Sequence, residues 1–511
     1  MMVHPNSGAA LPFQSRNTDD DSPDADISIW LDPHEDRLRE ECGVFGIAGN
    51  GEASVITALG LHALQHRGQE GCGIVTFDGQ LFYNERHLGL VGDHFTGADL
   101  LTRLPGPSAI GHVRYATQGG TILRNIQPLF ADLSGGGIGV AHNGNITNAR
   151  MLREQLVENG AIFQSTSDSE VILQLIARSR AARTIDRFVD ALHQIEGAYA
   201  LVALTNKSMI GARDPLGIRP LVLGDLDGAP VLASETCALD MIGASFVREI
   251  ENGEVVVCRP GGVESIKPFG RRAARPCVFE HVYFSRPDSV VDGKSVYDVR
   301  KRMGMRLAQE TAIDADVIVP VPDSGVPAAL GYAESSGIPY ELGIIRNHYV
   351  GRTFIEPTQH MRTLGVRRKH SANRGVLTGK RVILVDDSIV RGTTSRKIVQ
   401  MVRDAGASEV HLRSASPAIQ WPDFYGIDMP DRGQLIAGHK NVSEMAQILG
   451  VDSLGFLSVD GLYWALGEDA RDPHAPRYSD HCFTGDYPTR LVDHERAQSD
   501  KDHQLSFLVD A

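Results

Sequence analysis

The chain has 511 residues, of which 42% are hydrophobic and 22% charged, and its net charge is −14 at pH 7; this is long enough for two or more domains and typical of a soluble globular protein. It contains no run of about 18 apolar residues and no basic start followed by an apolar segment, so we expect neither a membrane span nor a secretory signal. The acidic charge argues against general affinity for nucleic acids or anionic membranes. Six scattered cysteines without a CxxC pair fit a reducing compartment, so we expect a cytoplasmic protein.

The first 41 residues differ in composition from the rest of the chain. They include the run NTDDDSPDAD and carry ten acids against three arginines, which accounts for half of the net charge. A segment this polar does not bury enough apolar surface to fold alone. We therefore expect residues 1–41 to form a disordered acidic leader that ends where the composition changes, at Cys42.

Residues 42–275 hold many short strands and few helices. CGVFGIAG, SAIGHVRYAT, GGIGVAH, AYALVAL and EVVVC are typical of strands, whereas ASVITALGLHALQH has helical spacing and is predicted to end at Gly68. Ser167, with Glu170 three residues later, predicts a capping box before an apolar helix. This pattern favours an α+β domain with largely antiparallel sheets.

From residue 276 the rhythm of the sequence changes. Apolar strands such as VIVP, RVILVDD and SEVHLRS alternate with helices such as VYDVRKRMGMRLAQET and TTSRKIVQMVRDAGA. Such alternation predicts right-handed βαβ units and a parallel sheet. We expect an α/β domain over residues 276–430 and a C-terminal extension of helices and tail over residues 431–511.

The most specific motif is RVILVDDSIVRGTTS, residues 381–395. A strand buried on both faces delivers Asp386 and Asp387 to its C-terminal end, where open α/β sheets bind ligands. Gly392 and the hydroxyls after it can begin the next helix and form a phosphate cradle. Two carboxylates beside such a loop suit a sugar diol and Mg²⁺, a cation that prefers oxygen ligands. A solvated turn at a strand end is the alternative for a lone acidic pair.

The complete motif resembles the 5-phosphoribosyl 1-diphosphate (PRPP) motif of type I phosphoribosyltransferases. The resemblance implies one Mg²⁺ per subunit, held by Asp386, Asp387 and Ser324, because Ser324 follows a second predicted strand in VIVPVPDSGVPAALG. The residues implied to bind PRPP are Asp386, Asp387, Ser388, Arg391, Gly392, Thr393 and Thr394.

A basic segment lies between the two strands. Residues 346–381 hold nine Lys or Arg against one acid, Glu356, within an acidic protein. Such a segment needs an anionic partner, and PRPP carries a pyrophosphate and a 5′-phosphate. Because long loops in compact domains are uncommon unless functional, we interpret the segment as a lid over PRPP. A nucleic-acid patch is the alternative, weakened by Pro357 and by the lack of a nucleic-acid-binding motif.

Five short segments of the first domain, CGVFG, HRGQE, GHVRYAT, HNGN and SDSE, follow one another in that order. Each alone has an ordinary explanation, such as a buried thiol, surface arginines or an Asn-Gly turn. His62 and His66 have the i,i+4 spacing of a metal pair but lack companion ligands. Together the segments resemble the glutamine-amidotransferase domain of the N-terminal-nucleophile class, which implies a four-layer αββα fold over residues 42–275.

This resemblance makes Cys42 the nucleophile that attacks the side-chain amide of glutamine. A free α-amino group has a pKa of about 7.7–8.0 and can serve as general base for its own thiol. An internal cysteine has no such amine. We therefore expect autocatalytic cleavage between Glu41 and Cys42, which removes the leader as a propeptide. The Asn143 side chain and the Gly144 N–H would form the oxyanion hole.

The same resemblance supplies the residues that bind glutamine. Arg114 would hold the α-carboxylate of glutamine and Asp168 its α-ammonium group. Arg67, with the adjacent Gly68, would line the same pocket.

The first domain thus resembles an ammonia generator and the second an ammonia acceptor, the pairing found in the amidophosphoribosyltransferase family. The resemblance covers residues 42–490. It implies transfer of glutamine-derived ammonia through an internal channel to PRPP, giving 5-phosphoribosylamine, glutamate and pyrophosphate, the first step of de novo purine (IMP) synthesis. It also implies purine-nucleotide feedback inhibitors and a homodimer or homotetramer.

Some members of that family carry a [4Fe–4S] cluster on four cysteines. Here Cys277 lies in RPCVFEHVYF, but WPDFYGID has Asp423 where those members have a cysteine, and YSDHCFTGDYP holds only Cys482. Because a cluster needs about four thiolates, we expect none.

Two other classes of protein share parts of this pattern. A PRPP-sensing transcriptional regulator would need a DNA-binding module, and no such module is recognisable before the second domain. Another glutamine amidotransferase, such as a hexosamine-phosphate or asparagine synthetase, would share the first domain but lack RVILVDDSIVRGTTS.

Overall fold

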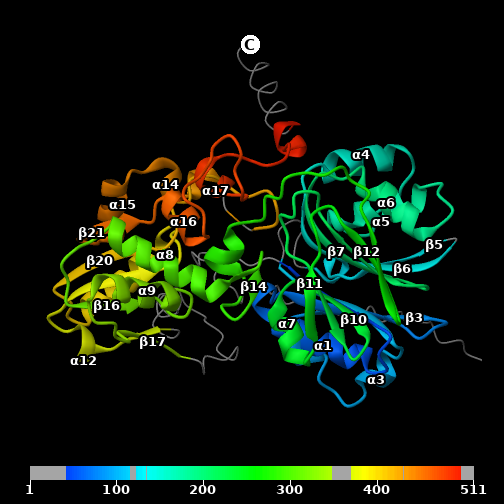
Figure 1. The fold of residues 1–511 in the computed structure, drawn as a ribbon, viewed down its shortest axis with the longest axis horizontal. Coiled ribbons are helices and arrows are strands. Elements are labelled where there is room, and N and C mark those ends of the chain that lie inside the picture. Colours follow the sequence, from blue (N-terminus) through cyan, green and yellow to red (C-terminus); the bar gives the residue numbers. More distant parts are fainter. Residues whose placement is uncertain are drawn as a thin grey trace, which may run out of the picture.

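The computed structural model describes residues 42–115, 122–133, 135–347, 370–427, 429 and 431–496. The predicted leader, and residues 348–369 of the predicted basic lid, lie outside the described residues. The described chain forms two lobes, one from each predicted domain (Figure 1). No helix in these ranges is long and apolar enough to cross a membrane.

The first lobe is built on two antiparallel sheets. Cys42 leads directly into β1, the central strand of the seven-stranded sheet, which pairs with β10 on one side and β4 on the other. In spatial order the strands of this sheet are β11 (Ser245–Glu249), β9 (Val222–Leu226), β10 (Ala229–Ala233), β1 (Gly43–Ala48), β4 (Ser108–Arg114), β2 (Gly71–Phe77) and β3 (Phe82–Leu88). The six-stranded sheet consists of β13 (Gly262–Ile266), β12 (Val255–Arg259), β8 (Met209–Arg213), β7 (Gly197–Thr205), β6 (Gly136–Ile146) and β5 (Leu129–Leu133).

Helices cover the outer faces of both sheets. Apolar side chains of the two sheets, such as Val44, Ile110 and Ala200, form the core between them. One helical layer packs on the seven-stranded sheet and the other on the six-stranded sheet. The first layer contains α1 (Ala53–Ala63), α2 (Val91–His94), α3 (Leu100–Arg103) and α7 (Thr236–Ile242), and the second α4 (Ala149–Glu158), α5 (Ser169–Arg178) and α6 (Thr184–Leu192). This order of layers confirms the predicted αββα fold.

Two local predictions in this lobe are wrong. α1 ends at Ala63 and is followed by a 3-10 turn, η2 (Gln65–Arg67), so Gly68 is not its left-handed terminal residue and instead has an extended φ of −164°. The N-cap of α5 is Asp168, not Ser167. The Glu170 carboxylate accepts hydrogen bonds from the backbone of Gln164 and Ser165 instead of closing a capping box.

The second lobe is centred on a parallel sheet. Its strands lie in the order β16 (Val317–Pro320), β19 (Arg381–Asp386), β20 (Glu409–Ser414) and β21 (Ser453–Phe456). The apolar run of β19 is buried between β16 and β20 because both of its faces are covered. Helices connect the strands, namely α8 (Val296–Glu310), α9 (Val326–Ser336), α12 (Arg374–Leu377) and α13 (Thr393–Asp404). This confirms the predicted α/β domain with a parallel sheet.

The C-terminal extension contains a strand as well as the expected helices. β21 joins the parallel sheet beside β20, so the sheet continues past residue 430. The helices are α14 (Ile436–His439), α15 (Val442–Leu449), α16 (Val459–Ala465) and α17 (His481–Thr484). The remaining short elements are η3 (Leu123–Asn125), η4 (Glu280–Phe284), β14 (Val290–Val291), β15 (Lys294–Ser295), β17 (Ile344–Arg346), β18 (His370–Ala372) and η5 (Arg432–Gln434).

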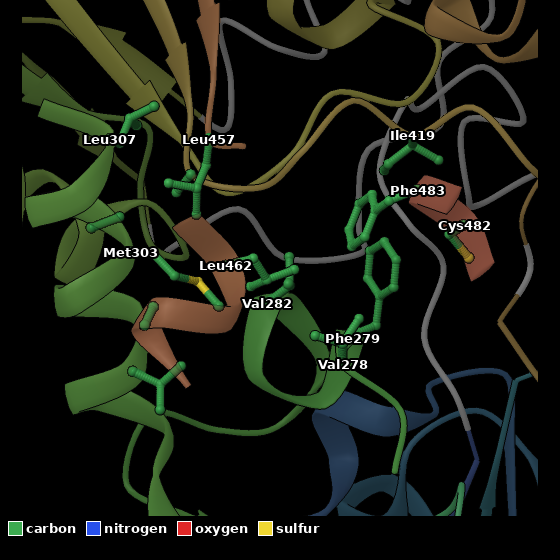
Figure 2. Packing of buried hydrophobic residues seen from close by; sticks show 14 of the residues in the cluster. Val278, Phe279, Val282, Met303, Leu307, Ile419, Leu457, Leu462, Cys482 and Phe483 are labelled. Carbon is green, nitrogen blue, oxygen red and sulfur yellow. The ribbon is translucent and has the colours of Figure 1, made fainter. Parts of the chain in front are cut away.

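One apolar cluster runs through the second lobe and reaches the first (Figure 2). Phe279, next to η4, stacks on Phe483 of α17 with ring centroids 5.1 Å apart. The cluster also includes Ala198 and Ile218 of the first lobe. The lobes are therefore joined by a shared core as well as by the chain.

Candidate active sites

Cys42 lies where β1 enters the middle of its sheet and is 7% exposed. Its thiol donates a hydrogen bond to the carbonyl oxygen of Tyr115, with 3.4 Å between Sγ and O. Burial raises the pKa of the Cys42 thiol, and the nearby charge of Arg114 only partly opposes this. The thiol is therefore protonated at neutral pH and needs a base to act as a nucleophile.

Arg114 ends β4, beside the nucleophile. Its guanidinium is buried and donates to the carbonyl oxygen of Asn125 at 3.0 Å. Gly68 allows this arrangement, since a Cβ at Gly68 would lie 2.7 Å from the Arg114 backbone. The structure thus brings together Cys42, Gly68 and Arg114, three of the residues expected to act on glutamine.

Asn143 and Gly144 lie on β6 of the opposite sheet. The Asn143 side chain is fully buried, and neither its nitrogen nor its oxygen has a hydrogen-bond partner among the described residues. Gly144 has a φ of +134°, and a Cβ there would lie 2.1 Å from the carbonyl oxygen of Ala198. His112 of β4 contacts the His142 carbonyl oxygen at 3.0 Å, which ties β6 to the strand beside β1. A buried amide without partners is costly unless a ligand completes it, so this amide fits an oxyanion hole.

Asp168 connects β6 to the start of α5. Its Oδ1 accepts a hydrogen bond from the Ser169 N–H at 2.8 Å and its Oδ2 one from the Ile146 N–H at 3.1 Å. His142 Nδ1 lies 3.6 Å from Oδ2. Burial lowers the pKa of His142, which keeps the imidazole neutral. Asp168 is therefore the negative group of this corner and fits an ammonium partner.

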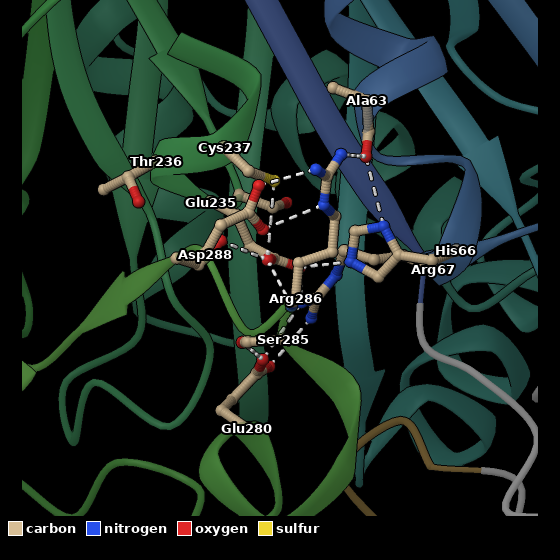
Figure 3. A network of polar contacts seen from close by, with 12 residues as sticks. Ala63, His66, Arg67, Glu235, Thr236, Cys237, Glu280, Ser285, Arg286 and Asp288 are labelled. Atoms are coloured by element: carbon tan, nitrogen blue, oxygen red, sulfur yellow. Dashed lines mark hydrogen bonds and ion pairs between the residues drawn. The ribbon is translucent and has the colours of Figure 1, made fainter. Parts of the chain in front are cut away.

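Arg67 of η2 is fully buried, and Figure 3 shows its side chain in a polar network with Glu235 and Glu280. Its Nε donates to the carbonyl oxygen of Cys42 at 3.2 Å. Its guanidinium is paired with two carboxylates, those of Glu235 and Glu280. Neighbouring His66 binds Glu235 at 2.7 Å, so this histidine serves the ion-pair network. Arg67 therefore contacts the backbone of Cys42, and its expected place in the glutamine pocket stays a prediction.

A segment of the second lobe reaches β6 beside Asn143 and Gly144. The carbonyl oxygen of Phe424 accepts a hydrogen bond from the Asn145 side chain at 2.9 Å. Gly426 has a φ of +124°, and a Cβ there would lie 3.1 Å from the Gly144 backbone. The two lobes therefore meet backbone to backbone next to Gly144.

The second lobe places the acidic pair of β19 at the C-terminal edge of the sheet. Asp386 and Asp387 are 8% and 7% exposed. The Ser388 hydroxyl donates to the Asp387 carboxylate at 2.6 Å. The loop then turns through Gly392, which has a φ of +79° and starts α13, with Thr393 and Thr394 as its first residues. This places acids, hydroxyls and a helix N-terminus together, as a phosphate and diol site requires.

Arg391 of this loop contacts the side chain of Gln434 at 3.3 Å. Ser324 lies in the neighbouring loop after β16 and is half-buried. That loop packs on β19, because the Val321 N–H donates to the Val385 carbonyl oxygen at 2.9 Å. The preceding Asp323 forms an ion pair with Arg346. Ser324 and the acidic pair thus share one edge of the sheet, and their oxygen atoms fit a hard cation such as Mg²⁺.

Comparison with known proteins agrees with both halves of this picture. The family model of a glutamine amidotransferase domain matches residues 112–241, and that of a phosphoribosyl transferase domain matches residues 289–415. An amidophosphoribosyltransferase from Rhizobium etli is 63% identical over 464 residues, which cover 90% of this chain and 94% of that protein. One from Bacillus subtilis is 51% identical and covers 89% of this chain and 95% of its own.

The chain belongs to the amidophosphoribosyltransferase family. A solved structure of the Bacillus subtilis glutamine PRPP amidotransferase, complexed with ADP and GMP, is 49% identical and has a TM-score of 0.83. It covers 88% of this chain and 98% of that one. The similarity spans both lobes, so the fold and the domain pairing that the motifs implied are confirmed.

The cysteine set of this family member does not fit a [4Fe–4S] cluster. Cys277 and Cys482 are buried near each other, but the groups that lie within metal-ligand distance of Cys482 among the described residues are Asp423 and His481. His481 Nε2 binds Asp423 Oδ1 at 2.7 Å, and Asp423 Oδ2 accepts the N–H groups of Tyr425 and Ile427. Two thiols and a satisfied carboxylate–imidazole pair do not supply four thiolates.

Sequence motifs missed several groups that shape the sites. Glu235 and Glu280 are buried counter-charges of Arg67; Glu235 lies in none of the quoted segments, and Glu280 lies in RPCVFEHVYF, which was considered only for Cys277. His142 belongs to the quoted HNGN segment. The sequence does not show that its imidazole lies beside Asp168; the structure does. In the sequence, Glu235 could be noticed only as an acid that directly precedes the helix α7.

Proposed function

We propose that the chain transfers ammonia from glutamine to PRPP, yielding 5-phosphoribosylamine, glutamate and pyrophosphate in the first step of de novo purine synthesis. The observation that carries this proposal is the pairing of two sites in one chain. One holds a buried thiol with an unpartnered amide nearby on β6, and the other an acidic pair beside a hydroxyl-rich helix start. The names of the relatives from Rhizobium etli and Bacillus subtilis support the same reaction.

In the first lobe Cys42 is the nucleophile once cleavage after Glu41 frees its α-amino group. The amine takes the thiol proton, and Sγ attacks the side-chain carbonyl carbon of glutamine. The Asn143 side chain and the Gly144 N–H stabilise the oxyanion. The amine returns its proton to the leaving nitrogen, ammonia departs, and water hydrolyses the thioester to glutamate.

The ends of glutamine are held by opposite charges. Arg114 binds the α-carboxylate and Asp168 the α-ammonium group. Both are buried, so each charge acts in a medium where pairing is stronger than in water. Arg67, which contacts the Cys42 backbone, and Gly68, which lies against Arg114, line the same pocket.

In the second lobe the acidic pair and the loop after it hold PRPP. Asp386 and Asp387 face the ribose hydroxyls, and the loop and helix start hold the 5′-phosphate through Ser388, Arg391, Gly392, Thr393 and Thr394. Ammonia displaces pyrophosphate from the ribose. One Mg²⁺ per subunit, held by Asp386, Asp387 and Ser324, would neutralise charge on the pyrophosphate. No iron–sulfur cluster takes part in this proposal.

We extend the proposal to regulation and assembly. The Bacillus subtilis relative was solved with ADP and GMP, which supports purine nucleotides as feedback inhibitors here. We propose a cytoplasmic homodimer or homotetramer that binds neither nucleic acid nor membranes.

A direct assay tests the reaction. Purified protein, supplied with Mg²⁺, glutamine and PRPP, should release glutamate and pyrophosphate in equal amounts, and intact mass should show a chain that begins at Cys42. Glutamate release that does not depend on PRPP would indicate that the protein is another kind of glutamine amidotransferase. PRPP binding without turnover would favour a PRPP-sensing regulator. Glutamine-dependent activity in protein that still begins at Met1 or Met2 would overturn the proposed cleavage.

A further inference from the structure

The two lobes meet at a buried cation that touches the backbone of the nucleophile. Arg67 Nε donates to the Cys42 carbonyl oxygen at 3.2 Å, and its side chain is wholly inaccessible to solvent. A buried guanidinium needs counter-charges. Glu235 at the start of α7 supplies one, with 2.6 Å between Oε1 and Nη1. The second comes from Glu280, in the other lobe.

Glu280 holds Arg67 with both carboxylate oxygens (Figure 3). Its Oε1 lies 2.8 Å from Nη2 and its Oε2 lies 3.0 Å from Nη1. Such a two-point contact fixes the plane of the guanidinium as well as its position. Although burial opposes the charge, Arg67 holds the pKa of Glu280 below its ordinary range, so the carboxylate is ionised at neutral pH. The direction in which Nε points toward Cys42 is therefore set largely by Glu280.

The turn that presents Glu280 is fixed from the phosphoribosyl side. Arg300 of α8 donates to the carbonyl oxygens of His281 at 2.7 Å and Ser285 at 2.8 Å, which lie within and just after η4. The Ser285 hydroxyl in turn donates to the Glu280 carboxylate. Burial lowers the pKa of Arg300 to about 10. Among the nearby negative charges that raise this pKa, that of Asp387 has the largest effect. A continuous series of contacts thus runs from Arg300 of α8, through Ser285 and Glu280, to Arg67 and the backbone of Cys42.

We propose that Glu280 is a positioning residue for glutamine chemistry, through which the second lobe sets the place of the nucleophile in the first. This inference rests on the proposed function. Glu280 does not touch glutamine or the thiol; it orients Arg67, and Arg67 orients the Cys42 carbonyl and thereby the sulfur and amine of the same residue. A misplacement of about 1 Å in a reacting group can lower a rate about a hundredfold, so a buried carboxylate of the other lobe can control this step.

The test is Glu280→Gln, which keeps the shape of the side chain and removes its charge. With PRPP saturating, we expect the kcat for glutamine-dependent synthesis to fall at least tenfold, while the KM for glutamine changes less than twofold. Synthesis with ammonia in place of glutamine should stay within twofold of the wild type. Ser285→Ala, which removes one hydrogen bond to Glu280 and leaves the charge, should lower the same kcat by a smaller factor.

Glu254→Gln is the matched control. Glu254 is as buried as Glu280 and binds Arg248 with two oxygens, each at 2.8 Å, but it lies elsewhere in the first lobe. It should leave both activities within twofold of the wild type. Equal glutamine kcat in E280Q and E254Q, or equal loss of the ammonia and glutamine reactions in folded E280Q, would overturn the inference. If the wild type itself released no glutamate and pyrophosphate from glutamine and PRPP, the proposed function would fail instead.

Discussion

The unpartnered amide of Asn143 leads to a prediction that joins activity to stability. Asn143→Ala removes the side-chain donor of the proposed oxyanion hole and leaves the Gly144 N–H. Loss of one such donor lowers kcat by about 10²–10³-fold. We expect a loss of this size in glutamine-dependent synthesis and in glutamate release, with ammonia-dependent synthesis unchanged.

The same substitution should not destabilise the protein. A buried polar group without partners costs about 1–3 kcal/mol, and both side-chain polar atoms of Asn143 are in that state among the described residues. Its removal relieves this cost, while the small cavity left behind costs about 1 kcal/mol. The net change is between about 0 and 2 kcal/mol in favour of folding, and each kcal/mol shifts the melting temperature of a lobe of this size by about 2–4 °C. The melting temperature should therefore stay constant or rise by a few degrees.

Asn148→Ala supplies the comparison. Asn148 is also buried, but its amide donates to the Gln194 carbonyl oxygen at 3.0 Å and accepts from the Glu196 N–H at 2.9 Å. Its loss leaves those two backbone groups unpaired, so we expect a melting temperature several degrees lower and a nearly normal kcat. Both variants can be measured by calorimetry and by steady-state assay. A clear fall in the melting temperature of Asn143→Ala, or a kcat near that of the wild type, would refute the assignment of the Asn143 amide as an oxyanion donor that is unpaired until substrate binds.

Three further predictions concern other groups. Cys42→Ala should abolish glutamine-dependent synthesis and spare ammonia-dependent synthesis; loss of both activities in a folded variant would contradict the division of labour between the lobes. Asp423→Asn should destabilise the protein by about 1–3 kcal/mol at pH 7, because the Asp423 carboxylate contacts the His481 imidazole and accepts the N–H groups of Tyr425 and Ile427, and the amide replaces one of its accepting oxygens by a donor. Although burial opposes it, His481 holds the pKa of Asp423 below its ordinary value, so this stabilisation is complete above about pH 4 and is lost as the pH falls through the lowered pKa. The wild type and Asp423→Asn should therefore converge in stability in acid, and a constant difference down to pH 2 would contradict the lowered pKa of Asp423. Iron and sulfide analysis of anaerobically purified protein should find no cluster, and a near-stoichiometric amount would overturn that expectation.

Local patterns predicted the elements that hold the chemistry. The apolar run of β19 ends in Asp386, and Gly392 begins the next helix, as the motif indicated. The alternation of strands and helices was sufficient for the parallel sheet. These features depend on residues within about fifteen positions of one another, where periodicity and turn residues carry information.

Contacts between distant residues were not predictable. Arg67 finds Glu235 and Glu280 at 168 and 213 residues along the chain, and no local pattern specifies such pairing. Glu170 is a local exception: its carboxylate accepts the N–H groups of Gln164 and Ser165, just before the helix, and the capping-box pattern does not specify that loop conformation. β21 is short, and its place beside β20 results from packing in the C-terminal extension.

The contact between Gly144 and Gly426 has a consequence for how natural variants would be understood. Position 426 belongs by chain order to the phosphoribosyl half, far from the glutamine motifs, and a variant there would be assigned to PRPP binding. A methyl group at that position would instead contact the backbone of Gly144 on β6. Its metabolic signature would be a cell that grows on ammonia but starves for purines when glutamine is its nitrogen source.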